Sequence, residues 1–156
     1  YCEEINVAAS SPYQLELRRC VAQFKLIVED EIPEEVKKMK FFYTGGSSTF
    51  DAINGIGSVA SRQTEERTIQ QEQRSGNAEF GIYTFPRAKE GELKVEVSAL
   101  NNSKVAVKER AYENVPITKN RISIYKEKFF NGSITTKASN FSLLINDEWE
   151  QQEYTR

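Results

Sequence analysis

The stretch "LELRRCVAQFKLIVED", Leu15–Asp30, decides the fold because its second half alternates strictly between two faces. Side chains two residues apart lie on the same face of a β-strand. The two faces therefore carry different sets, which are Cys20, Ala22, Phe24, Leu26 and Val28 on one, and Val21, Gln23, Lys25 and Ile27 on the other. This pattern predicts a strand with its first face in a core.

The apolar phase changes at Arg18 and Arg19. Before them, Tyr13, Leu15 and Leu17 place the apolar set at odd positions, whereas it falls at even positions afterwards. A shift of one residue reverses the faces of a strand, so the change predicts a bulge or a bend here. We expect Arg18 and Arg19 to protect a strand edge from wrong pairing, or to belong to an interaction surface.

The same two-residue alternation recurs along the chain, which predicts an antiparallel β-sandwich of about seven strands in one domain, 1–156. Turn signals rich in Gly, Asn and Ser separate the alternating segments. Those segments are 39–43, 79–84, 92–99, 104–108, 121–125 and 141–146. The predicted core consists of Cys20, Ala22, Phe24, Leu26, Val28, Phe41, Val95, Val97, Ile122, Ile124, Phe141 and Leu143.

Segments between the strands carry weaker signals. Pro33–Lys38 has Pro and acids first and lysines last, the order expected of one helical turn. Residues 61–77 are polar apart from Ile69 and predict a long exposed loop. We expect the termini, 1–12 and 150–156, to be flexible.

The chain lacks the residues on which common catalytic sites are built. It contains no histidine, which excludes Ser-His-Asp and Cys-His catalysis and the His ligands of catalytic zinc. The acidic residues of 29–35 match no calcium-loop spacing and predict a solvated turn. We expect no enzyme, catalytic residue, cofactor or metal; a rival hydrolase would need two buried carboxylates in a cleft.

Bulk properties limit the partners. Lys and Arg number 21 and Asp and Glu 23, which gives a formal net charge of −2 without the basic surface that nucleic acid requires. No apolar run has the roughly 18 residues needed for a transmembrane helix. The start at Tyr1–Cys2 suggests a processed product. Cys2 and Cys20 can form a disulfide in an oxidising compartment or remain thiols.

The aromatic residues suggest a second function. Exposed rings can stack on sugar faces, and Tyr125 and Trp149 are among the aromatic residues with a place in the sequence that permits exposure. A carbohydrate-binding surface module of a glycan-uptake system is therefore an alternative. It requires a flat row of exposed rings, in which these two residues would take part.

Five motifs in order resemble the fimbrillin-like surface proteins of the Bacteroides group. The first is "LRRCVAQF", Leu17–Phe24, which is followed by "DEIP", Asp30–Pro33, and by "STFDAI", Ser48–Ile53. Near the end come "NVPITKNR", Asn114–Arg121, and the closing strand "NFSLLINDEWE", Asn140–Glu150. The motifs bracket about four fifths of the chain.

The resemblance implies a transthyretin-like β-sandwich that is exported as a lipoprotein precursor and displayed at the outer membrane or cell surface. It implies a pilus component or adhesin that assembles with other subunits, or with copies of itself, by strand donation after proteolytic removal of an N-terminal strand. In that mechanism an apolar groove is filled by a partner's strand, and main-chain hydrogen bonds supply affinity. Host or bacterial surface ligands or glycans are the remaining expected partners.

Overall fold

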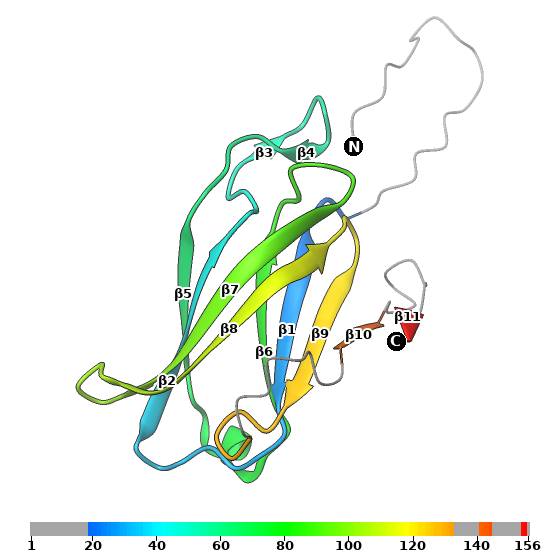
Figure 1. The fold of residues 1–156 in the computed structure, drawn as a ribbon. Helices are drawn as coiled ribbons and strands as arrows, with labels where there is room; N and C mark the ends of the chain where they lie inside the picture. Colours follow the sequence, from blue (N-terminus) through cyan, green and yellow to red (C-terminus); the bar gives the residue numbers. More distant parts are fainter. Residues whose placement is uncertain (1–18, 133–140, 145–153, 156) are drawn as a thin grey trace, which may run out of the picture.

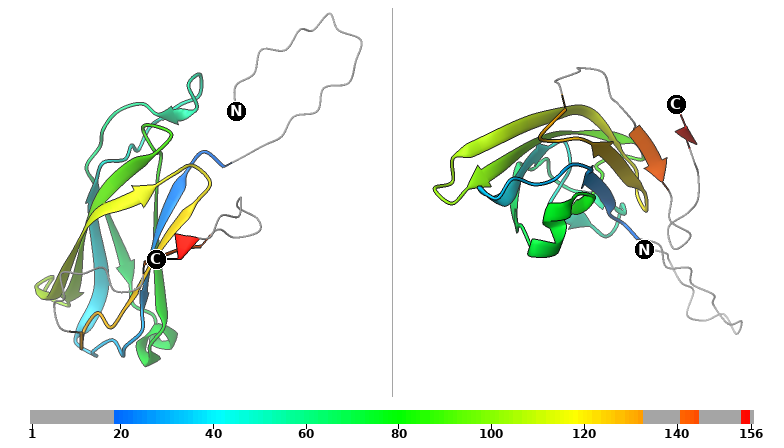
Figure 2. Two further views of the ribbon diagram at one scale, coloured as in Figure 1. Left: turned by 45° about the vertical axis from the view of Figure 1, so that its right-hand side comes forward. Right: turned by 90° about the horizontal axis from the view of Figure 1, so that it is seen from below.

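Two β-sheets face each other across one core (Figures 1 and 2). The structure is a computed structural model that describes residues 19–132, together with the backbone of 141–144 and 154–155. Seven of the strands in this part of the chain have six or more residues. The all-β sandwich predicted from the sequence is confirmed. Among the described residues no helix has the length and apolarity to cross a membrane.

The first sheet has the strand order β11-β10-β9-β1-β6. Its strands are β1 (Ala22–Val28), β6 (Ala78–Thr84), β9 (Ile122–Glu127), β10 (Phe141–Leu144) and β11 (Tyr154–Thr155). β1 pairs with β6 in antiparallel fashion but with β9 in parallel. This parallel pair departs from the antiparallel arrangement expected from the sequence. β1 and β9 run in the same direction and therefore end at the same end of the sandwich.

The second sheet is antiparallel throughout and has the order β5-β2-β7-β8. Its strands are β2 (Val36–Thr44), β5 (Gln63–Thr68), β7 (Gly91–Asn101) and β8 (Ala106–Ile117). A separate hairpin of β3 (Phe50–Asp51) and β4 (Ile56–Gly57) lies at one end of the sandwich (Figure 1). The Asn54–Gly55 turn signal falls at its tip.

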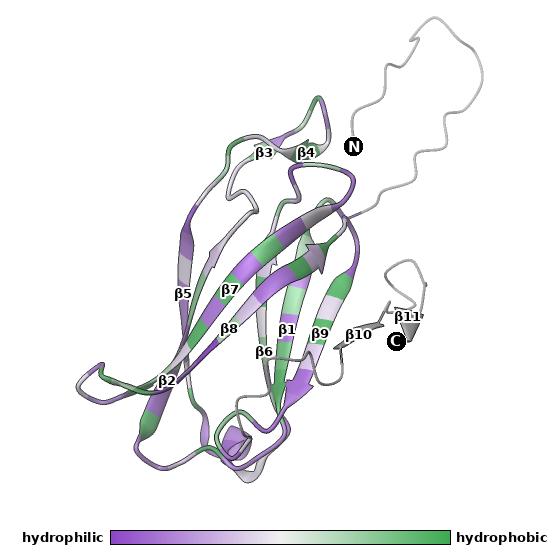
Figure 3. Ribbon diagram, in the orientation of Figure 1, coloured by the Kyte–Doolittle hydropathy of each residue, from purple (hydrophilic) through white to green (hydrophobic). Residues whose placement is uncertain are grey.

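The core is built from alternate residues of facing strands. Phe24, Leu26 and Val28 of β1 are buried, as are Val95 and Val97 of β7. Apolar and polar bands alternate along β7 in Figure 3. The prediction for these strands is confirmed, although Cys20 is only half-buried. The side chains of Phe141 and Leu143 lie outside the described residues.

The two faces of β9 are the reverse of the prediction. Ile122 and Ile124 are buried, but they form a small cluster with Val21 and Ile27 on the outer face of the first sheet. Ser123 and Tyr125 share the face of Phe24 and Leu26, because these residues are direct register partners in the parallel pair. Alternation alone could not distinguish the faces, since both bury side chains.

Residues 61–77 are not one long loop. They contain β5, which pairs with β2, and a short 3-10 helix, η1 (Gln71–Ser75). β5 is an edge strand with alternate residues exposed, and its sequence "QTEERT" has no apolar side chain to signal a strand. Ile69, between the two elements, is buried in the core.

A smaller expectation is also wrong. Pro33–Lys38 forms a turn, closed by the Val36 N–H donating to the Pro33 carbonyl at 2.9 Å, and then enters β2 instead of a helix. Burial of Val36 and Met39 in the core favours the extended strand. Val105 and Val107 are exposed because the β7–β8 hairpin extends past the rest of the sheet (Figure 1).

Truncation of Phe24 to Ala should lower the free energy of unfolding by about 3–5 kcal/mol, because it leaves a cavity between the sheets. Urea denaturation followed by circular dichroism measures the change. The matched control is Lys25→Ala on the opposite face, where an exposed ion pair with Glu79 is lost at a cost below about 1 kcal/mol. Equal losses in both variants would contradict the assigned faces of β1.

Candidate interaction site

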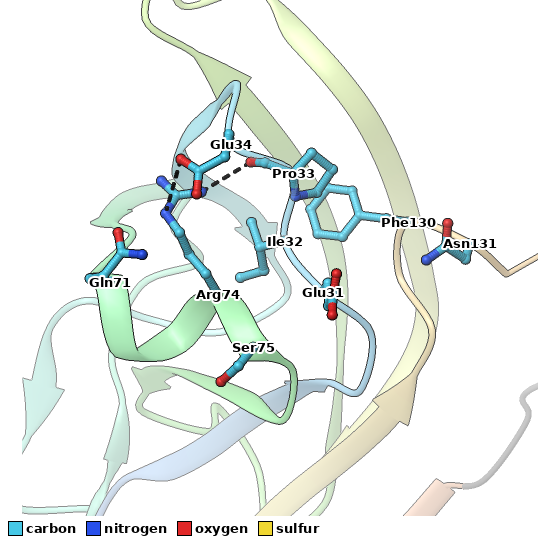
Figure 4. Close-up of a pocket in the computed structure, with 9 residues that line it drawn as sticks. All are labelled: Glu31, Ile32, Pro33, Glu34, Gln71, Arg74, Ser75, Phe130 and Asn131. Carbon is cyan, nitrogen blue, oxygen red and sulfur yellow. Dashed lines mark hydrogen bonds and ion pairs between the residues drawn. The ribbon is translucent and has the colours of Figure 1, made fainter.

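A pocket of about 520 Å³ lies at the end of the sandwich opposite the β3–β4 hairpin. Three segments distant in sequence form it, as Figure 4 shows. They are the β1–β2 loop (Glu31, Ile32, Pro33 and Glu34), η1 (Gln71, Arg74 and Ser75) and the turn after β9 (Phe130 and Asn131). Strand ends bring these loops together, since β1 and β9 finish at the same end.

Arg74 holds the β1–β2 loop against η1. Its Nη1 and Nη2 each donate to a main-chain carbonyl at 3.0 Å, one of Pro33 and the other of Val36. The Glu34 carboxylate lies 3.9 Å from Nε. The Ile32 N–H donates in return to the Arg74 carbonyl at 3.1 Å. These two hydrogen bonds fix the guanidinium against the wall of the pocket.

The turn at residues 129–132 is fixed from both sides. Asp30 Oδ2 accepts from the N–H groups of Phe130 and Asn131 at 2.9 and 2.7 Å. On the other side, Arg110 Nη2 donates to the carbonyls of Phe129 and Gly132. Buried Phe129 packs edge-on against the ring of Phe130, with centroids 5.1 Å apart. These contacts set the Phe130 ring at the pocket.

The pocket has an apolar floor and an acidic rim. The half-buried Pro33 and Phe130 supply apolar surface above the buried Ile32, while Glu31 and Glu34 are exposed at the margin. Arg74 keeps its positive charge and pairs with Glu34 at 3.9 Å, so the charged side chains that line the pocket, Glu31, Glu34 and Arg74, leave a net charge of −1. Such a surface suits an apolar group that has a positive charge beside it.

Reactive chemistry has little to build on among residues 19–132. No group of three or more His, Cys, Asp or Glu side chains there could hold a metal ion. Asp30 Oδ1 is a buried oxygen without a hydrogen-bond partner, but its companion Oδ2 fixes a turn. Glu127 accepts from the Tyr112 hydroxyl inside the sandwich. These carboxylates therefore have structural contacts.

The interaction residues predicted from the sequence do not meet at this pocket. Arg19 is exposed just before β1, whereas Arg18 and Trp149 lie outside the described residues. Tyr125 is not an exposed platform: its ring packs 5.4 Å from Phe24 and 5.1 Å from Tyr112, measured between centroids. The reversed faces of β9 explain this, because they turn Tyr125 towards the core.

A row of exposed rings, which the carbohydrate-binding alternative requires, is not seen in residues 19–132. Tyr83 is the one aromatic residue among the exposed large hydrophobic side chains there. The remaining members of that group are aliphatic, namely Ile53, Val59, Val105 and Val107.

The edge of β6 is closed by side chains of the second sheet. The Tyr43 hydroxyl and Arg67 Nη2 each lie 3.2 Å from a β6 carbonyl, that of Tyr83 and that of Gly81 respectively, and donate to it. Beyond the strand, Ser47 and Phe85 exchange backbone hydrogen bonds of 3.0 Å. A further strand would have to displace these groups to pair with β6.

The edge of β8 is more open. β8 has 12 residues and pairs with β7 alone, so in the described part of the chain its outer edge has no strand partner. Near its end, the Ser123 hydroxyl donates to the Pro116 carbonyl. The register also shifts beside Asn114, which has a φ of 53° and marks a bulge. The segment from Ala106 to Glu113 is therefore the longer exposed edge.

Comparison with known proteins places the chain in a family. The model of the "Family of unknown function (DUF6562)" matches residues 1–156. The chain belongs to DUF6562. Neither the curated proteins nor the solved structures give a significant match. Membership of DUF6562 covers the full sequence and carries no activity with it.

Sequence reasoning did not find the pocket of this DUF6562 protein. Its acidic residues were noticed as a solvated turn at 29–35, and Asn131–Gly132 as a turn signal. No pattern linked them, because their meeting depends on the parallel pairing of β1 with β9. The adjacent rings of Phe129 and Phe130 beside a turn were the available signal, since only one of them can face the core.

Replacement of Asp30 by Ala should loosen the turn after β9, because two backbone N–H groups lose their acceptor at a cost of about 1–3 kcal/mol. Amide hydrogen exchange at Phe130 and Asn131 should accelerate. Glu31→Ala, which changes an exposed neighbour, serves as the control. Unchanged exchange at both amides in the Asp30 variant would contradict the proposed clamp.

Stability should fall at alkaline pH. Burial, reinforced by Glu127, holds the pKa of Tyr112 well above its usual range, and burial raises the pKa of Tyr125 to about 12. Unfolded tyrosines ionise near pH 10, so above this pH the unfolded state binds fewer protons and gains stability. Urea denaturation between pH 8 and about 11 measures this change. The free energy of unfolding should keep the full contribution of these two tyrosines at pH 8 and should fall progressively above about pH 10.

The variant Tyr112→Phe isolates the buried hydroxyl in this experiment. This variant should lose less stability at alkaline pH. Tyr83→Phe, at an exposed position, should keep the wild-type dependence of the free energy of unfolding on pH. If the free energy of unfolding depended on pH equally in the wild type and in Tyr112→Phe, the prediction for the Tyr112 hydroxyl would be wrong.

Proposed function

We propose that this DUF6562 protein is a non-enzymatic, exported surface protein, a fimbrillin-like pilus component or adhesin that assembles through β-strand interactions. The motif order from Leu17 to Glu150 supports the family resemblance, and the sandwich fold is compatible with it. A lipoprotein precursor displayed at the outer membrane or cell surface belongs to the same proposal.

The observation that carries the proposal is the contrast between two sheet edges. β6 is closed by Tyr43 and Arg67 from the opposite sheet, whereas β8 presents a long edge beside exposed Val105 and Val107. Native proteins usually cover or interrupt such edges, because unpaired backbone groups invite another strand. An uncovered edge of this length is suited to accept one.

The chemistry of β8 defines the strand that fits beside it. Val107, Glu109 and Ala111 are exposed alternate residues of this strand. An incoming strand gains backbone hydrogen bonds along the edge and is favoured by basic or apolar side chains near Glu109. Self-pairing centred on Glu109 would place two like charges opposite each other, so a different strand is preferred.

A peptide that copies the closing strand, Asn140–Glu150, tests strand acceptance in trans, and the amide signals of β8 distinguish acceptance there from pairing with β9, the neighbour of β10. We expect the peptide to raise the melting temperature or drive polymerisation, and to shift the backbone amide signals of Ala106–Glu113 in an NMR titration. Val107→Lys should abolish these effects, because a lysine on an edge opposes pairing.

The control is Thr64→Lys on β5, the other edge of the same sheet, which should retain the response. Absence of any thermal or NMR change at millimolar peptide would refute acceptance at β8. Surface display is tested separately by antibody labelling of intact cells of a native host, and protection of the protein in intact cells would exclude display.

A further inference from the structure

The two ends of the sandwich carry opposite charge. We define the hairpin end by residues 19–21, 45–62, 85–90 and 118–121, and the pocket end by 29–35, 69–77, 102–105 and 128–132. Strand directions place these loops at opposite ends, as Figure 1 shows. The hairpin end has a net charge of +4, with the basic residues Arg19, Arg62, Arg87, Lys89, Lys119 and Arg121 and the acidic residues Asp51 and Glu90.

The pocket end is acidic. Its loops have a net charge of −3, from six acidic and three basic residues, so among the described residues the two ends differ in sign. The acidic residues are Glu29, Asp30, Glu31, Glu34, Glu35 and Glu72, and the basic ones are Arg74, Lys104 and Lys128. Copies of this chain would therefore repel each other when like ends meet and attract when opposite ends meet.

The hairpin end presents an apolar tip. Ile53, at the turn of the β3–β4 hairpin, is 81% exposed, and Val59 nearby is 63% exposed. An isoleucine at such an exposed position gains free energy when a partner removes it from water. Scattered apolar residues are common on protein surfaces, but this tip is also held in one conformation.

Several hydrogen bonds pre-organise the tip. Asp51 Oδ1 accepts from the N–H groups of Ile53 and Asn54 at 2.9 and 3.2 Å, and the Gly55 N–H donates to the Asp51 carbonyl at 2.8 Å. Lys119 Nζ donates to the Gly55 carbonyl at 3.0 Å, which sets a positive charge beside the tip. A fixed loop loses little entropy on binding.

The pocket at the other end has the complementary properties. Its floor is apolar, through Pro33 and Phe130 above the buried Ile32, and its rim carries Glu31 and Glu34, the latter paired with Arg74 at 3.9 Å. Arg74 and Asp30 hold two of its walls by hydrogen bonds, so the pocket is pre-formed. An apolar side chain with a lysine beside it matches both surfaces.

We propose that the Ile53 hairpin of one copy docks into the Ile32–Phe130 pocket of the next. The occupant is a second copy of this chain, and Lys119 of the docking copy approaches Glu31 and Glu34 of the receiving copy. The two surfaces differ and lie at opposite ends, so the contact is head to tail and leaves a free end on each side, which produces an open chain of subunits. The contact does not depend on strand acceptance at β8.

Two blocked variants test the polarity of this contact. Ile53→Asp removes the apolar tip but keeps the pocket, while the double variant Glu31→Lys, Glu34→Lys reverses the rim but keeps the tip. Sedimentation velocity at low salt should show concentration-dependent oligomers for the wild type and monomers for each variant alone. An equimolar mixture of the two should give a dimer that does not grow, because only one compatible pair of ends remains.

Salt should dissociate these species, since charge attraction is strongly screened at 0.5 M salt. Val107→Lys on β8 is the matched control and should oligomerise like the wild type, which separates this contact from strand acceptance. Circular dichroism confirms that each variant is folded. A wild type that stays monomeric at 1 mM, a folded blocked variant that still oligomerises, or a mixture that remains monomeric would each overturn the proposal.

Discussion

Burial of one face of β1 between the two sheets is the constraint on which the rest of this structure depends. Phe24, Leu26 and Val28 point into the core, and β1 is hydrogen-bonded on both edges, to β6 and to β9. A central strand with two partners fixes the register of both neighbours, since slippage by one residue would expose its apolar face. The loops that follow β1 and β9 are consequently delivered to the same end, where they form the pocket.

The two sheets contact each other differently along their two long edges, where β5 meets β6 and where β8 meets β9. Between β5 and β6, Tyr43 and Arg67 reach from one sheet to the backbone of the other. Between β8 and β9, the Tyr112 hydroxyl donates to the half-buried Glu127 carboxylate, and the Ser123 hydroxyl reaches the Pro116 carbonyl near the end of β8. This second arrangement leaves more of the neighbouring strand edge uncovered, so the molecule has one closed and one accessible side.

Much of this architecture could be predicted from periodicity. The alternation along β1 and β7 identified both strands and the buried face of each. Periodicity could not orient β9, because Ile124 on one face and Tyr125 on the other are both at least half-buried. It also missed β5, whose position at an edge removes the need for apolar residues. An exposed strand and a polar loop have the same composition in this case.

The pocket and the charge polarity of the ends could not be predicted for a different reason. Both depend on which loops share an end of the sandwich, and that follows from strand order. The acidic residues at 29–35 form one cluster in the sequence, whereas the basic residues of the other end are spread between Arg19 and Arg121. Their opposition along the long axis appears only when the direction of each strand is known.

The parallel pairing of β1 with β9 has a consequence for the order of events after synthesis. Gln23 and Ile122 are register partners although about 100 residues separate them in the chain, and contacts between such distant residues form slowly because a large loop must close first. The central strand cannot acquire its second neighbour until residues 122–127 have been made. Until then the first sheet lacks its centre, so β1 and β6 can pair early but the full core closes only after β9 arrives.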